Sequence, residues 1–323
     1  MKILQITAPG QSTILDLPIP EPKEGEVLVR VEAITTCVQW DLHCRHDEAM
    51  FVGHKFFYPY TPGRPGHEAV GTVAGIGAGV TQVAVGDRVA CWRDQGENIQ
   101  GAYAHYYINP APNVIRVPEG LPASALAPIE MAMCIATVFR GLEEMNALAG
   151  RSIGIVGLGP AGLISLQMAK ACGAAEVVGF DPVAERRELA LELGADACYD
   201  PTTDLSALVP ARTAGARLQT TIDCVGAKQT VDFAMDHTGD VVAFFGVQRE
   251  EYVYGLQHGG LTLLGYKGHS WESAQYAVQL IEQGKLNLSP LSTVNLPLER
   301  YDEGIAMLER REAIKVCYWP WEG

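Results

Sequence analysis

Polar and apolar positions alternate in short stretches over about the first 125 residues, and glycine and proline separate these stretches. The segments "EVLVRVEAI", "AVGTVAGIG" and "AYAHYYI" are typical examples. A period of two residues indicates a strand with one buried face. The first part of the chain therefore predicts a β-rich domain built from many short strands.

The pattern changes at about residue 152. There "SIGIVGLG" and "AEVVGFD" are apolar strands, and each precedes a helix, "PAGLISLQMAKACG" and "PVAERRELALELG". The segments "LQTTIDCVG" and "DVVAFFGV" continue as strands. Strands that alternate with helices predict a parallel sheet with right-handed crossovers. From about residue 265, two amphipathic helices and a closing strand, "AIKVCYW", end the chain.

Composition and charge narrow the classes of ligand. The chain is 48% hydrophobic and 19% charged, as in ordinary soluble globular proteins. Its formal net charge is −14 without a prominent lysine and arginine cluster, so we expect no nucleic-acid partner and no anionic membrane. The sequence offers neither a signal peptide nor an apolar run of roughly 18 residues. These features predict a cytoplasmic protein with free thiols and a small-molecule ligand.

The segment "VGLGPAG", residues 156 to 162, has the spacing G-x-G-x-x-G directly after a strand and at the start of a helix. The glycines permit a tight turn, close approach of a pyrophosphate and close helix packing, and the helix N-terminus attracts phosphate. An alternative is a nucleotide-free unit in which the glycines serve only packing. The candidate cofactor-binding residues in this segment are Gly157, Gly159, Pro160, Ala161 and Gly162.

Asp181 follows the next strand, where an acid can hydrogen-bond both hydroxyls of an adenosine ribose. Such an acid repels a 2′-phosphate, so it favours NAD over NADP. Arg186 and Arg187 oppose this preference by their charge. We expect both arginines on the solvated face of the following helix, and we retain Arg186 as a cofactor-binding candidate.

Zinc donors occur in three separate segments. Cys37 follows the strand "VLVRVEAITT", His67 and Glu68 open another in "RPGHEAVGTV", and Glu130 lies in "LAPIEMAM", where the first domain gives way to the second. A catalytic zinc uses about three protein ligands and one open position. The alternatives are an inert buried thiol at Cys37 and a surface turn at His67 and Glu68.

These segments, together with "VGDRV" at residues 85 to 89, resemble the zinc-dependent alcohol dehydrogenase type of medium-chain dehydrogenases/reductases. The resemblance covers essentially the whole chain. It implies an α/β protein with a GroES-like catalytic domain, residues 1–125 completed by 265–323, and a Rossmann NAD-binding domain, residues 126–264. It also implies a homodimer or homotetramer.

Glu130, in place of a cysteine, resembles the sorbitol and threonine dehydrogenase branch. That resemblance implies zinc ligation by Cys37, His67 and Glu68, with Glu130 next, and leaves open which glutamate binds. Family members with a structural zinc carry four closely spaced cysteines after the "GDRV" segment. Here only Cys91 is present, so we expect one catalytic zinc and no structural zinc.

The segment "CVQWDLH" departs from the family pattern, because Asp41 and His43 come one residue late and the usual hydroxyl residue is missing. We expect Asp41 to orient His67 and His43 to end a proton relay to solvent, with Glu68 as a further catalytic group. Asp41 as a helix N-cap and His43 as a surface residue are the alternatives.

The resemblance implies hydride transfer between an alcohol and NAD, with zinc lowering the pKa of the alcohol. The altered "CVQWDLH" segment and the aromatic residues between 44 and 62 suggest a polyol, a sugar or a cyclic secondary alcohol. Two alternatives remain: a zinc-free quinone or enone reductase, and a non-catalytic nucleotide-binding member.

Overall fold

The computed structural model describes residues 1–94 and 96–322, and the chain forms two compact units. Unit 1 comprises Met1–Met131 and Leu288–Gly323, and unit 2 comprises Ala132–Asn287. The combination of a β-rich domain and a parallel-sheet domain confirms the predicted fold class.

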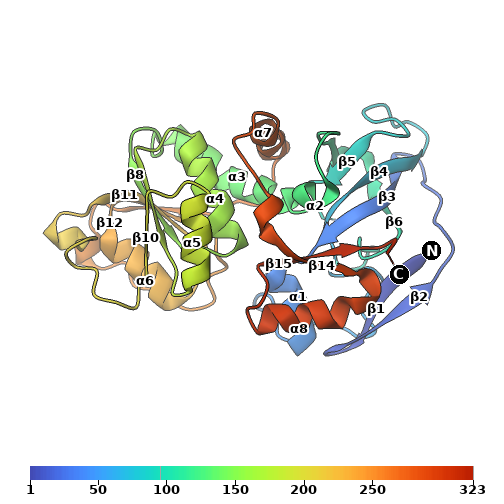
Figure 1. Ribbon diagram of the computed structural model, residues 1–323, viewed down its shortest axis with the longest axis horizontal. Coiled ribbons are helices and arrows are strands. Elements are labelled where there is room, and N and C mark those ends of the chain that lie inside the picture. Colours follow the sequence, from blue (N-terminus) through green and yellow to red (C-terminus); the bar gives the residue numbers. More distant parts are fainter. Residues whose placement is uncertain (95, 323) are drawn as a thin grey trace. The chain divides into compact units, whose positions relative to one another are not determined.

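Unit 1 is built around a seven-stranded sheet with the order β14-β15-β3-β4-β5-β7, in which β6 also pairs with β3 (Figure 1). A separate two-stranded sheet joins β1 and β2. The strands are β1 (Lys2–Ala8), β2 (Gln11–Asp16), β3 (Glu26–Thr35), β4 (Glu68–Ile76), β5 (Arg88–Cys91), β6 (Tyr106–Pro110), β7 (Val114–Arg116), β14 (Ser292–Pro297) and β15 (Lys315–Trp319). The α-helices that lie wholly in this unit are α1 (Val38–His46), α2 (Ala123–Leu126) and α8 (Tyr301–Glu309).

The end of strand β3 is where unit 1 brings distant segments together. Strand β4 runs antiparallel to β3, with Thr35 opposite Glu68, and β15 pairs with the same end of β3, with Cys317 opposite Thr35. Most side chains of β3 are buried, which fits a central strand with neighbours on both sides. The end of β3, the start of β4 and the start of β15 therefore meet at one corner of the sheet.

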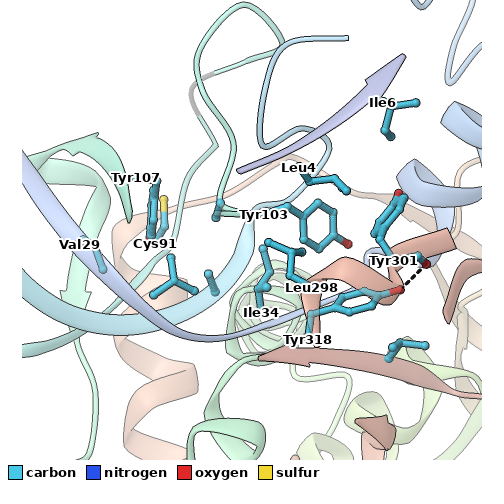
Figure 2. Close-up of a cluster of buried hydrophobic side chains, with 14 of the residues drawn as sticks. Leu4, Ile6, Val29, Ile34, Cys91, Tyr103, Tyr107, Leu298, Tyr301 and Tyr318 are labelled. Carbon is cyan, nitrogen blue, oxygen red and sulfur yellow. Dashed lines mark hydrogen bonds between the residues drawn. The ribbon is translucent and has the colours of Figure 1, made fainter. Parts of the chain in front are cut away.

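Three tyrosines pack close together in the core of unit 1 (Figure 2). The ring centroids of Tyr103 and Tyr301 are 5.1 Å apart, and those of Tyr301 and Tyr318 are 5.6 Å apart. The hydroxyl of Tyr318 donates a hydrogen bond to the carbonyl of Tyr301 at 2.8 Å. Residues from the first and last parts of the chain thus share one core.

Unit 2 contains a six-stranded parallel sheet with the order β10-β9-β8-β11-β12-β13 (Figure 1). This is a Rossmann-type arrangement, as the alternation of strands and helices predicts. The strands are β8 (Ser152–Val156), β9 (Glu176–Phe180), β10 (Ala197–Tyr199), β11 (Leu218–Asp223), β12 (Thr238–Phe244) and β13 (Thr262–Gly265). The helices are α4 (Pro160–Ala171), α5 (Ala184–Glu192), α6 (Lys228–His237) and α7 (Trp271–Glu282), together with most of α3 (Ile129–Glu144).

The chain returns to unit 1 at Leu288 and not near residue 265. Strand β13 extends the parallel sheet by pairing with β12, and helix α7 also belongs to unit 2. The hydroxyl of Thr137 donates to Ser273 at 3.0 Å, and that of Tyr276 donates to Glu143 at 3.2 Å. These contacts fix α7 against α3, so the boundary lies later than the sequence pattern predicts.

One helical segment, Ala123–Glu144, is long and apolar enough to cross a membrane by length and composition alone. However, 78% of its most apolar window is buried inside the protein. Its apolar side chains contact other parts of the protein, as in a core helix.

Candidate metal centre and dinucleotide loop

The structure brings together three of the predicted zinc ligands. The sulfur of Cys37, a ring nitrogen of His67 and a carboxylate oxygen of Glu68 all lie within 4.8 Å of one another. Cys37 follows β3, and Glu68 is the first residue of β4, so the pairing of these two strands accounts for their proximity. A thiolate, an imidazole and a carboxylate form a donor set that suits zinc.

The ring of His67 is oriented by the backbone. Its Nδ1 atom lies 2.8 Å from the carbonyl oxygen of Pro65, which can only accept, so Nδ1 carries the hydrogen and donates it. With Nδ1 held in this way, Nε2 is the nitrogen that can bind a metal once the metal displaces its proton. Glu130 lies near the Nε2 edge of the His67 ring, with its Oε2 atom 3.9 Å from Nε2. Glu130 is therefore placed as a candidate fourth ligand.

Glu68 is fully buried, and its two carboxylate oxygens have different surroundings. Oε2 accepts hydrogen bonds from the ammonium of Lys315 at 2.5 Å and from the hydroxyl of Thr35 at 3.1 Å. Oε1 is buried and has no hydrogen-bond partner among the described residues. An unpaired buried oxygen beside a thiol and an imidazole is costly unless a ligand satisfies it. A metal ion bound to Oε1 would satisfy it, so these residues fit a zinc site.

The charges around this centre favour a cation. Burial raises the pKa of Glu68, the charge of Lys315 lowers it, and the charge of Glu130 raises it again. Burial lowers the pKa of His67, but Cys37, through its charge and a hydrogen bond, and Glu130, through its charge, raise it well above the usual value. Glu68 thus lies close to the negative charge of Glu130, which a divalent cation would offset.

The glycine-rich segment forms the turn that a dinucleotide requires. Gly157 has a φ of +86°, and a Cβ atom on Gly162 would lie 1.8 Å from the carbonyl oxygen of Gly157. Only glycine fits both positions without displacing the backbone. Helix α4 begins at Pro160 with Gly159 as its N-cap residue, which has no side chain that could occupy the first N–H groups. These N–H groups are therefore available for a phosphate.

Asp181 stabilises this loop through hydrogen bonds. Its Oδ2 accepts a hydrogen bond from the backbone N–H of Leu158 at 2.8 Å, and its Oδ1 accepts one from Val183 at 2.9 Å. We expected Arg186 and Arg187 on the solvated face of the helix. Instead, both side chains contact Asp181. Nη1 of Arg186 lies 3.6 Å from Oδ2 of Asp181, and Nη1 of Arg187 donates to the Asp181 carbonyl at 2.7 Å. The first turn of α5 is close enough to Asp181 for both contacts.

Comparison with known proteins identifies the family. Residues 23–119 match the alcohol dehydrogenase GroES-like domain, and residues 160–283 match the zinc-binding dehydrogenase domain. An alcohol dehydrogenase of Geobacillus stearothermophilus is 30% identical over 329 residues, which cover 92% of this chain and 94% of that protein. The chain belongs to the zinc-type alcohol dehydrogenase family of medium-chain dehydrogenases/reductases.

Other relatives of this chain are named after other substrates. An L-threonine 3-dehydrogenase of Thermococcus kodakarensis is 28% identical over 356 residues, covering 100% of this chain and 99% of the relative. A sorbitol dehydrogenase of Pongo abelii is 27% identical over 347 residues, covering 97% and 94%. The crystal structure of 2R,3R-butanediol dehydrogenase from Bacillus subtilis has a TM-score of 0.85 with 21% identity and 99% of both chains covered, so it supports the fold.

Asp41 has a different role in this family member from the one we expected. Its carboxylate does not orient His67, whose Nδ1 lies on Pro65. Instead, Tyr103 donates to both Asp41 oxygens at 3.0 Å, and Tyr301 donates to Oδ1 at 2.7 Å. Burial raises the pKa of Asp41 to about 6, although the hydrogen bonds from both tyrosines lower it.

The position of Asp41 within α1 explains this difference. The N-cap residue of α1 is Cys37, so Asp41 is not the N-cap. Its N–H donates to the carbonyl of Cys37 at 2.9 Å, one helical turn back. Its side chain then points into the tyrosine cluster and anchors the helix that starts directly after Cys37. Asp41 is therefore a positioning residue for a candidate metal ligand.

His43 lies on the same helix, with Nδ1 3.2 Å from the carbonyl oxygen of Glu48 and 3.8 Å from its carboxylate. Its part in a proton relay stays a prediction. Sequence reasoning missed Lys315, Tyr103 and Tyr301 as supports of the site. The lysine in the apolar strand "AIKVCYW" was a usable signal, because a lysine within a buried strand needs a charged partner.

Proposed function

We propose that this chain is a zinc- and NAD-dependent dehydrogenase that oxidises a polyol, a sugar or a cyclic secondary alcohol and reduces the corresponding carbonyl compound. The observation that carries the proposal is the buried, unpartnered Oε1 of Glu68 beside Cys37 and His67. We assign one zinc per chain to Cys37, His67 and Glu68, with Glu130 as the fourth or exchanging ligand. The names of the threonine, sorbitol and butanediol dehydrogenases support an alcohol with a neighbouring polar group.

The residues of unit 1 hold and shape the metal site. Zinc, when bound, acts as a Lewis acid that lowers the pKa of an alcohol oxygen. His67 presents Nε2 because Pro65 holds Nδ1, and α1, anchored through Asp41, fixes Cys37 at its N-terminus. Glu68 supplies a buried negative charge beside the metal, and its further role as a catalytic group is part of the proposal. His43 is proposed to pass the released proton to solvent.

The residues of unit 2 hold the dinucleotide, which accepts the hydride at its nicotinamide ring when bound. The N–H groups at the start of α4, after Gly159, would bind the pyrophosphate, and Gly157 and Gly162 would allow its close approach. Asp181 is proposed to bind the adenosine ribose. The partly exposed Arg186 neutralises some of its charge, so we expect a preference for NAD that is moderate.

Steady-state turnover tests this function. We expect reduction of NAD with at least one member of a panel of polyols, sugars and cyclic alcohols, and less activity with NADP. Activity with quinones or enones alone, retained after zinc removal, would support a zinc-free reductase. Tight NAD binding without turnover of any panel member would support a non-catalytic nucleotide-binding protein. Sizing of the same sample tests the proposed homodimer or homotetramer.

A further inference from the structure

Lys315 and Glu68 form an ion pair in which both side chains are fully buried, with Nζ and Oε2 2.5 Å apart. Other ion pairs of unit 1 are more exposed. In the pair of Arg88 with Glu32, the side chains are 9% and 23% exposed. A buried lysine loses its hydration and is retained only where its charge is matched. The pairing with Glu68 is thus the reason that Lys315 can occupy this position.

Lys315 also contacts the segment that carries Cys37. Its ammonium donates a second hydrogen bond, at 2.5 Å, to the carbonyl of Thr36, the residue before Cys37. The backbone reinforces this contact, because the N–H of Thr36 donates to Val316 at 3.0 Å and the N–H of Val316 donates to the Thr36 hydroxyl at 3.1 Å. One ammonium group therefore connects the two segments that supply Cys37 and Glu68.

The two carboxylate oxygens of Glu68 have different partners, and this difference indicates the role of Lys315. Lys315 and Thr35 occupy Oε2, while Oε1 has no partner among the described residues. Without a metal, Lys315 is the cation in direct contact with this carboxylate. With a metal on Oε1, two cations would share the same negative charge, and the lysine would weaken the hold of the carboxylate on the metal.

We propose that Lys315 is the resident counter-ion of Glu68: it keeps the metal site folded before the metal binds and competes with the metal for Glu68 afterwards. This inference rests on the proposed zinc site. It makes Lys315 a positioning residue. Its charge should stabilise the metal-free protein more than the zinc-loaded protein, which is not expected of a residue with a merely structural role.

The test compares Lys315→Met with the wild type by thermal unfolding, with and without zinc, and by zinc titration against a chelating dye. Removing one partner of a buried ion pair is expected to lower the Tm of the metal-free protein by roughly 10 °C. Zinc should restore most of this loss, because the metal neutralises Glu68 in place of the ammonium. The folded variant should therefore bind zinc about a hundredfold more tightly than the wild type, because the stability that zinc restores equals the gain in its binding free energy.

Two further variants make the test specific. The double variant Lys315→Met/Glu68→Gln removes both charges, so its metal-free Tm should return toward that of the wild type, while its gain from zinc should fall. Arg88→Met breaks the less buried pair with Glu32 in the same unit, and its loss of Tm should be equal with and without zinc. If Lys315→Met does not fold without metal, zinc added during refolding should rescue it.

An equal loss of Tm with and without zinc in Lys315→Met, or unchanged zinc affinity, would overturn the role of Lys315 and leave the zinc site intact. Failure of zinc to rescue an unfolded Lys315→Met would do the same. A wild-type protein that binds no zinc would overturn the proposed function, and with it this inference.

Discussion

Thr35 and Glu68 lie opposite each other on strands β3 and β4, and the Thr35 hydroxyl donates to Oε2 of Glu68 at 3.1 Å. This pairing explains why residues 30 positions apart form one site. Cys37 lies two residues beyond Thr35, and His67 lies one residue before Glu68. A register shift of one residue would turn these side chains to opposite faces of the sheet. The sheet register is therefore the main determinant of the candidate metal centre.

The buried carboxyl of Asp41 predicts a pH-dependent effect on stability. Burial raises its pKa from 3.8 to about 6, so between these values the folded state binds a proton that the unfolded state has lost. Its contribution to the free energy of unfolding consequently falls as the pH rises from 4 to 6. Asp41→Asn does not ionise, so we expect the variant to gain up to about 3 kcal/mol relative to the wild type over this range.

Urea unfolding of both proteins at several pH values between 4 and 7 measures this difference. Asp302→Asn, on α8, is the control for the loss of a carboxylate outside the tyrosine cluster. The carboxylate of Asp302 accepts a hydrogen bond from the N–H of Ser12. A stability difference between Asp41→Asn and the wild type that stays constant with pH would contradict the account of Asp41.

Gly162→Ala should strongly weaken dinucleotide binding. The added methyl group would meet the carbonyl of Gly157 at 1.8 Å and push α4 away from the turn. We expect the Kd for NADH, measured by fluorescence titration, to rise at least about a hundredfold, a loss of about 2.7 kcal/mol. Gly239→Ala, where the nearest atom is 3.4 Å away, should bind NADH normally. Equal affinity in both variants would place the dinucleotide elsewhere.

Arg186→Ala should sharpen the preference for NAD. Nη1 of Arg186 lies 3.6 Å from Asp181, so its removal leaves the carboxylate uncompensated and more repulsive to a 2′-phosphate. The ratio of kcat/KM for NAD to that for NADP should rise about tenfold, which corresponds to about 1.4 kcal/mol. Arg151→Ala, which breaks a pair with Asp240 in the same unit, should leave the ratio unchanged. A ratio that falls in Arg186→Ala would contradict the assignment.

The sequence predicted the parts of the fold that depend on local pattern. The strands and helices around "VGLGPAG" lie where their periodicity and glycines indicate, and the segments of Cys37, His67 and Glu68 meet as the family resemblance implies. The contacts of individual side chains were less predictable. A shift of one residue within a helix turns a side chain by about 100°, and this accounts for the different partner of Asp41.

Lys315 shows a second limit of prediction from the sequence, which concerns contacts between distant segments. It lies 247 positions from Glu68 along the chain, and only the pairing of β15 with β3 brings the two together. The pattern of the closing strand predicts burial but does not specify which strand it joins. Likewise, the domain boundary near residue 288 depends on the packing of α7 on α3, which the amphipathic pattern of α7 does not specify.

The proposed function depends on zinc binding by Cys37, His67 and Glu68, which elemental analysis of protein purified without chelators can measure. We expect about one zinc per chain in the wild type and in the control Cys224→Ser, whose thiol lies in unit 2. Cys37→Ser and His67→Ala should each lose the metal while NADH binding persists. A folded wild-type protein that binds NADH but contains no zinc would show that these three residues are not a zinc site.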